Sequence, residues 1–304
     1  MSGAGEKSTS HILQSLAVNV AIAVFKGGAA VYTGSGALLA ETIHSSADCG
    51  NQLLLLLGVK QAGKAPDASH PLGYGRSLYF WSFMVALLLF TGGGVFSIYE
   101  GIHKMMHPEP VENVWVGVAI LLFSLVLEGL STLSNIRELN KRRAEVPFFK
   151  YLRETKDSDL IVVFGENAAA TLGLFFALAS LCAAYLTHDG RYDAAGSLAI
   201  GLILIGVALF LAREVMSLLV GESADPNIEK QTRDIVEKSP ELNALLNLIT
   251  IQQGPGEVLV AIKVKIESHL TADQVCEAIN KFERELRSRC PEVKWCFVEP
   301  DLEA

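Results

Sequence analysis

The sequence predicts an α-helical membrane protein with six transmembrane helices, followed by a small α+β domain at its C-terminal end. Three observations predict this fold class. Half of the 304 residues are hydrophobic and only 19% are charged, a balance that is unusual in a soluble globular chain. Six apolar stretches are long enough to cross a bilayer, which takes about 20 helical residues. From Glu222 onward the long apolar runs stop and charged residues become frequent.

The six apolar stretches all lie within residues 1–221, which we expect to form the membrane domain. They cover residues 11–31, 35–59, 78–102, 114–135, 159–187 and 192–219. The first ten residues have the features of neither a cleavable signal peptide nor an arginine-rich transit segment, so the first stretch is expected to be a permanent helix. Lys and Arg gather in the second-to-third and fourth-to-fifth connections, which places both loops and both termini in the cytoplasm or its organellar equivalent.

Residues 222–304 predict a separate domain with the element order helix, strand, strand, helix, strand. This segment holds sixteen Asp and Glu against ten Lys and Arg. Strict alternation of apolar residues in 257–266 predicts a strand with one buried face. Thr271 is a candidate N-cap for the second helix. The other expected elements are a helix at 225–239 and strands at 244–252 and 293–298.

Charge and cysteine content exclude several classes of protein. The net charge of −8 provides no cationic surface for DNA or RNA, so nucleic acid is not an expected partner. The five cysteines are scattered without CxxC spacing, which favours free thiols over a disulfide framework or a zinc finger.

The second apolar stretch contains the most informative polar residues of the chain. Glu41, His44 and Asp48 lie at spacings of three and four, so they share one face of a helix. Ionisable residues at bilayer depth cost about 3 kcal/mol each and are retained when they face partners, ions or water. Imidazole with carboxylate suits Zn²⁺ and, less selectively, Mn²⁺, Fe²⁺ or Co²⁺. The alternative is a polar network that only packs helices together.

The fifth apolar stretch offers Glu166 and Asn167 to complete a metal site. Glu166 is the stronger candidate ligand, with an interhelical hydrogen bond or a proton-carrying role as its alternatives. Asn167 is a weaker candidate, because amides are poor zinc ligands and adjacent helical residues point about 100° apart. Glu128, in the fourth stretch, is expected to pair with Lys26 or Asn19 of the first.

Several motifs together resemble the cation diffusion facilitator family. The run Ser35-Gly-Ala-Leu-Leu-Ala-Glu41-Thr-Ile-His44-Ser-Ser-Ala-Asp48 is similar to the helix-two signature of that family, and His70-Pro-Leu-Gly73-Tyr-Gly75-Arg76 is similar to its loop before helix three. The Glu41-xx-His44-xxx-Asp48 spacing and the Glu-Asn-Ala-Ala run of the fifth stretch most resemble the branch that contains zinc transporter nine. The resemblance covers nearly the whole chain.

The resemblance implies a homodimeric zinc/proton antiporter that works by alternating access, with residues 222–304 as a cytoplasmic ferredoxin-like dimerisation domain. It gives His44 and Asp48 transport-site roles. Two positions depart from the family pattern: Val162 stands four residues before Glu166, and Asn167 replaces an aspartate. We therefore expect His44, Asp48 and Glu166 to bind the transported ion, with Glu41 or water as fourth ligand. No resident cofactor is expected.

The resemblance also points to weaker accessory positions. Asp67 and His70 match residues that bind an accessory ion in relatives, although Tyr74 stands where some relatives have histidine. In the tail, His269 and Glu299 match metal positions of some relatives, but Phe297 replaces another, so a metal-sensing tail is not expected.

Three alternatives to an antiporter differ from it in sequence or in behaviour. An intramembrane metalloprotease needs H-E-x-x-H, which is missing here, so we expect no enzyme. A metal-responsive receptor would saturate at its number of sites, and a metal channel would show no proton coupling. The chain length favours a bacterial inner membrane, with an organelle membrane as the alternative.

Overall fold

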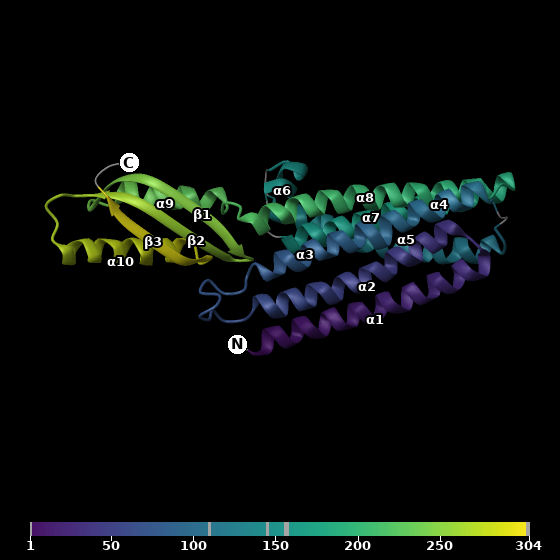
Figure 1. The fold of residues 1–304 in the computed structure, drawn as a ribbon, viewed down its shortest axis with the longest axis horizontal. Helices are drawn as coiled ribbons and strands as arrows, with labels where there is room; N and C mark the ends of the chain where they lie inside the picture. The colour runs from purple at the N-terminus through teal and green to yellow at the C-terminus, as the bar shows by residue number, and fades with distance from the viewer. Residues whose placement is uncertain (1, 109–110, 144–145, 155–157, 302–304) are drawn as a thin grey trace. The chain divides into compact units, whose positions relative to one another are not determined.

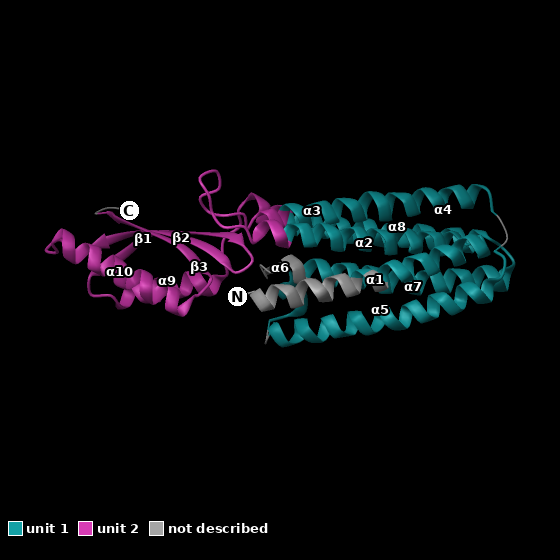
Figure 2. Ribbon diagram, turned by 90° about the horizontal axis from the view of Figure 1, so that it is seen from below, with its two compact units in different colours: residues 1–58, 80–152, 159–215 teal, residues 59–79, 153–158, 216–304 magenta. Residues whose placement is uncertain are grey.

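The computed structural model describes residues 2–108, 111–143, 146–154 and 158–301, and the chain divides into two compact units (Figures 1 and 2). The helical unit comprises residues 1–58, 80–152 and 159–215. The sheet unit comprises residues 59–79, 153–158 and 216–304.

The long helices of the chain run alongside one another in the helical unit (Figures 1 and 2). The helices up to Val220 are α1 (Ser2–Thr33), α2 (Gly36–Ala62), α3 (Ser77–Leu88), η1 (Leu89–Val95), α4 (Phe96–Met106), α5 (Val114–Arg142), α6 (Phe148–Glu154), α7 (Ser158–Thr187) and α8 (Arg191–Val220). A two-residue connection with Gly34 at φ +69° joins α1 to α2, a backbone conformation that glycine adopts without strain.

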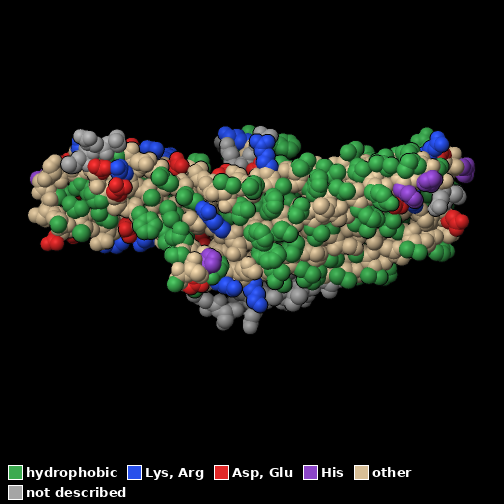
Figure 3. Space-filling view, viewed as in Figure 1, with side chains coloured by type: hydrophobic (Ala, Val, Ile, Leu, Met, Phe, Trp, Pro, Cys, Tyr) green, Lys and Arg blue, Asp and Glu red, His purple; other side chains and the backbone are tan. Residues whose placement is uncertain are grey.

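Within the described residues, four helical segments are long and apolar enough to cross a membrane. These are Ser77–Met106, Val114–Arg142, Ile161–Thr187 and Arg191–Val220. The polar residues in the middle of α2 lower its hydropathy. Apolar side chains are spread over much of the helical unit's visible face (Figure 3). The helical transmembrane domain predicted from the sequence is therefore confirmed in its coarse form, with four of the six expected spans.

The predicted helix at 78–102 contains a change in helix type. A π-helical turn, η1, lies between α3 and α4 and contains three consecutive glycines. A Cβ on Gly94 would lie 2.6 Å from Ile205 Cγ1 and 3.2 Å from Ile205 N of α8. The glycine thus permits a close approach of two backbones, as small residues do at membrane helix contacts.

The sheet unit has the element order that the sequence predicted. The elements are α9 (Pro226–Lys238), β1 (Leu242–Gly254), β2 (Glu257–Ile266), α10 (Ala272–Arg289) and β3 (Val293–Asp301). The sheet order is β1-β2-β3, with β2 antiparallel to β1 and parallel to β3. Thr271 caps α10 as predicted, and it forms a capping box with Gln274.

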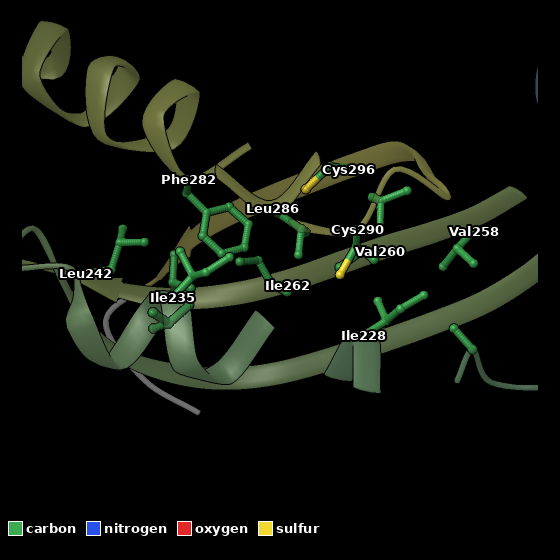
Figure 4. Close-up of a cluster of buried hydrophobic side chains, with 14 of the residues drawn as sticks. Ile228, Ile235, Leu242, Val258, Val260, Ile262, Phe282, Leu286, Cys290 and Cys296 are labelled. Atoms are coloured by element: carbon green, nitrogen blue, oxygen red, sulfur yellow. The ribbon is translucent and has the colours of Figure 1, made fainter. Parts of the chain in front are cut away.

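One apolar core holds this sheet to its two helices (Figure 4). Alternate residues of β2, from Val258 to Ile266, are buried, which confirms the predicted one-sided strand. Ile228 and Ile235 of α9 and Phe282 and Leu286 of α10 contribute to the same cluster. Both helices therefore cover the same face of the sheet.

Candidate functional site

The polar face of α2 brings His44 and Asp48 together, as their spacing of four predicts. His44 Nδ1 lies 3.6 Å from Asp48 Oδ1. His44 is 1% exposed and the Asp48 side chain 19% exposed. Both His44 ring nitrogens and Asp48 Oδ1 lack a hydrogen bond to any residue that the structure describes. Buried polar atoms normally have partners, so these atoms are available to an incoming ligand.

Glu41, the third acid or imidazole on this face, is engaged elsewhere. Its Oε2 atom lies 3.3 Å from Lys26 Nζ of α1, and Lys26 also donates a 2.9 Å hydrogen bond to Ser45 Oγ. The other oxygen of Glu41, Oε1, lies so close to Gly173 of α7 that a Cβ at this position would overlap it. The sequence predicted a pairing of Glu128 with Lys26 or Asn19, whereas Lys26 forms an ion pair with Glu41.

Glu166 of α7 accepts a 2.6 Å hydrogen bond from Asn51 Nδ2 of α2. Asn51 is fully buried and lies one turn after Asp48. The interhelical hydrogen bond that was one alternative for Glu166 is therefore present. The backbone carbonyl of the neighbouring Asn167 accepts a hydrogen bond from Thr132 Oγ1 of α5.

A cavity of about 410 Å³ joins several of these groups. Three carboxylates line it, those of Asp48, Glu128 and Glu166. The remaining lining residues are Asn19, Ile22, Gln52, Leu55, Leu127, Ser131, Asn135, Val163 and Asn167. Four helices, α1, α2, α5 and α7, thus surround a polar space within the helical unit. A cavity of this size with several oxygen donors has room for a hydrated cation.

The ligands are not gathered round one point in this conformation. No three His, Cys, Asp or Glu side chains within the described ranges lie close enough together to hold a metal ion. His44 and Asp48 are neighbours, Asp48 shares the cavity with Glu166 and Asn167, and Glu41 is held by Lys26. Binding one ion with His44, Asp48 and Glu166 together therefore requires these side chains to move closer to one another.

The side chain of Asp67 stabilises the conformation of the loop before α3. Asp67 Oδ1 accepts 2.8 Å hydrogen bonds from the backbone N–H groups of Ser69 and His70, and Tyr74 OH donates to Oδ2 at 2.7 Å. Hydrogen bonds from the Ser69 and Tyr74 hydroxyls are the main cause that lowers the Asp67 pKa well below its ordinary value. His70 Nδ1 lies 3.7 Å from Asp67 Oδ1, so the two expected accessory residues are neighbours.

The two tail residues each have a nearby charged partner. His269 Nδ1 lies 3.9 Å from Glu267 Oε2, and Glu299 Oε1 lies 3.7 Å from Lys263 Nζ. These contacts give each side chain a local role in the sheet unit.

Asp193 is a buried acid that sequence reasoning missed. It lies in the first turn of α8, and its Oδ2 accepts hydrogen bonds from the backbone N–H groups of Gly36 (2.5 Å) and Ala37 (3.4 Å). Its Oδ1 accepts a 2.6 Å hydrogen bond from Ser35 Oγ. Asp193 therefore caps the start of α2 from another helix. The available signal was an acid just inside an apolar stretch.

Comparison with known proteins assigns the family. The cation efflux transmembrane domain family matches residues 12–220, which is more than half of the chain. The chain therefore belongs to the cation efflux family, also called the cation diffusion facilitators, and the resemblance predicted from the sequence is confirmed. This is a family of transporters and not of enzymes.

Individual relatives cover most of the chain. "Proton-coupled zinc antiporter SLC30A9, mitochondrial" of Xenopus laevis is 32% identical over 268 residues, 88% of this chain and 48% of that protein. "Metal tolerance protein C4" of Arabidopsis thaliana is 30% identical over 73% of this chain and 49% of that protein. The chain spans about half the length of these two relatives. "Cation-efflux pump FieF" of Escherichia coli is 25% identical over 82% and 80%.

Proposed function

We propose that this chain moves a divalent cation, most readily Zn²⁺, across a membrane in exchange for protons. The observation that carries the proposal is the His44–Asp48 pair, beside a cavity lined by further carboxylates. Both imidazole nitrogens and Asp48 Oδ1 are buried and bond none of the described residues. Membership of the cation efflux family supports cation movement. The similarity to a proton-coupled zinc antiporter supports zinc as the metal and protons as the exchanged ions.

In the proposed site His44, Asp48 and Glu166 bind the ion, and water completes the shell. Zinc accepts imidazole nitrogen and carboxylate oxygen in a four-coordinate arrangement. Asn167 is a further oxygen donor at the cavity wall. Asp67 and His70 remain the proposed accessory pair in the loop before α3.

Proton exchange follows from the chemistry of the ligands. Metal binding requires neutral imidazole and ionised carboxylates, so cation and proton compete for the same atoms. Binding on one side displaces protons, and protonation of the same atoms on the other side releases the ion. Alternating exposure of one site couples the two flows.

We further propose that α1 and α2 complete a six-span domain over residues 1–221 with both termini cytoplasmic. Both helices are long enough to cross a bilayer, and in α2 the low hydropathy comes from the polar residues assigned to the site. Residues 222–304 are then a cytoplasmic ferredoxin-like domain that holds two copies together. A bacterial inner membrane stays a prediction, because relatives named mitochondrial are also similar to the chain.

The test is zinc-driven proton flux in proteoliposomes that contain the full chain. Asp48→Ala is expected to abolish both zinc uptake and proton release. Ser46→Ala is the matched control, because Ser46 is exposed on another face of α2 and its hydroxyl donates to Thr42 O of its own helix. Full transport by Asp48→Ala would reject the site. Uptake that saturates at the number of protein molecules would indicate a receptor, and uptake without proton flux a channel.

Competition among metals sharpens the substrate. Mn²⁺, Fe²⁺ and Co²⁺ added against radioactive Zn²⁺ are expected to compete less well than unlabelled Zn²⁺, because an imidazole with two carboxylates in a four-coordinate site favours zinc. Stronger competition by any of the three would assign that metal as the substrate in place of zinc.

A further inference from the structure

The helical unit buries one lysine that the proposed transport cycle does not use. Lys26 of α1 is 1% exposed, although lysine is almost never fully buried unless it is paired. Its ammonium lies between Glu41 Oε2 at 3.3 Å and Ser45 Oγ at 2.9 Å, both on α2. A charged residue at membrane depth marks a functional position by default.

The partner that Lys26 selects is the residue best placed to be a fourth ligand. Glu41 precedes His44 by three residues, so the two side chains lie on the same face of α2 and one turn apart. Glu41 is fully buried, and its Oε1 atom has no hydrogen bond within the described part of the chain. Without Lys26, this carboxylate would be an unpaired anion next to a cation site.

A fourth strong ligand would alter the transport cycle, because a transported ion must leave the site as well as enter it. Sites that conduct ions bind strongly enough to admit them and weakly enough to release them. Four protein ligands close the tetrahedral shell of a structural zinc site, whereas a site with three protein ligands holds exchangeable water in the fourth position. The Lys26–Glu41 ion pair leaves that position to water.

We propose that Lys26 is a positioning residue that withholds Glu41 from the transported cation, and so sets the affinity and release rate of the site. This inference rests on the proposed transport function. In this role the ammonium of Lys26 pairs with the Glu41 carboxylate in place of the metal ion. The transported cation is then bound only by His44, Asp48 and Glu166. A lysine that only fastened α1 to α2 would have no effect on how tightly zinc binds.

Lys26→Met tests the role through zinc affinity and transport kinetics of the full chain. Glu41 then becomes available, so the dissociation constant of Zn²⁺, titrated in detergent, is expected to fall about tenfold. In proteoliposomes KM and the maximal uptake rate are both expected to fall, because release becomes slow. Lys26→Arg keeps the charge and is expected to restore wild-type behaviour.

A second substitution identifies the carboxylate responsible. In Lys26→Met/Glu41→Gln the added ligand is gone, so zinc affinity is expected to return to within about threefold of wild type. Lys263→Met is the matched control, because it breaks the 2.5 Å ion pair with Asp301 in the sheet unit and leaves the helical unit intact. Its zinc affinity is expected to equal that of the wild type.

Two results would overturn the inference. One is an unchanged or weaker zinc affinity in folded Lys26→Met, and the other is a double variant that still binds as tightly as Lys26→Met. If Lys26→Met does not fold, Glu41→Gln decides: a tenfold loss of affinity would mean that Glu41 already binds the ion. If wild-type protein neither binds nor transports Zn²⁺, the proposed function itself fails.

Discussion

The apolar core of the sheet and the buried face of α2 differ in their polar atoms. In the sheet unit, sixteen buried residues form one apolar cluster, and the buried hydroxyl of Thr232 donates to the carbonyl of Ile228. In the helical unit, the buried face of α2 carries atoms of Glu41, His44 and Asp48 without hydrogen bonds among the described residues. The apolar cluster stabilises the sheet unit. The buried polar atoms of α2 that bond none of the described residues lower the stability of the helical unit, but they remain available to a ligand.

The largest expected effect is in the sheet unit. Phe282 is 2% exposed at the centre of the apolar cluster, so Phe282→Ala is expected to cost about 3–5 kcal/mol of stability. Amide hydrogen exchange of β2 in the full chain would measure it. Phe297→Ala is the matched control, because Phe297 is 55% exposed, and equal losses in the two variants would contradict the contrast between the units.

The opposite behaviour is expected at His44. His44→Leu removes two buried ring nitrogens that bond none of the described residues, so the thermal unfolding temperature should stay the same or rise. Zinc binding should weaken about a hundredfold, since a ligand is lost. Thermal unfolding and zinc titration in detergent would measure both. A loss of stability as large as that of Phe282→Ala would remove the distinction between the two interiors.

Helix capping gives a smaller contrast. Asp193→Ala removes a buried carboxylate that accepts from Ser35, Gly36 and Ala37, with an expected cost of about 2 kcal/mol. Thr271→Ala removes an exposed cap of α10, with an expected cost of about 1 kcal/mol. Denaturant unfolding monitored separately in each unit would rank the two, and a larger loss for Thr271→Ala would show that burial of the cap is unimportant.

The effect that is smallest at neutral pH belongs to a thiol of the sheet unit, because it develops only in alkaline solution. Burial raises the pKa of the Cys296 thiol to about 12 from an ordinary value of 9.0. The folded thiol therefore keeps its proton where the unfolded thiol loses it. Its contribution to stability is complete below pH 9 and is lost as the pH rises toward about 12. Unfolding measured between pH 8 and 11 should show this loss in the wild type and less of it in Cys296→Ala.

The structure could be predicted from the sequence wherever a periodic pattern within one helix or strand determines it. The alternation in 257–266 placed β2 with its buried face, and the spacing of His44 and Asp48 placed the two side chains 3.6 Å apart. The strand predicted at 244–252 is shorter than β1, Leu242–Gly254, because β1 also pairs with β2 at both ends, Leu242 with Ile266 and Gly254 with Glu257.

Contacts between distant helices were the part that the sequence did not reveal. Lys26 or Asn19 was expected to pair with Glu128, and Lys26 is paired with Glu41, because the rotation of α1 about its axis decides which acid Lys26 faces. The bond from Asn51 to Glu166 and the cap that Asp193 provides depend in the same way on how helices pack. Apolar stretches that are hydrophobic on all sides do not specify that rotation.

The carboxylate of Asp193 has a mechanical consequence for movement within the helical unit. It fastens the beginning of α2 to the beginning of α8 through donors on three successive residues. These hydrogen bonds oppose separation of the two helix ends. A tilt of α2 at that end is therefore expected to move α8 as well. In the proposed transport cycle, α2 and α8 are therefore expected to act as one moving element at that end.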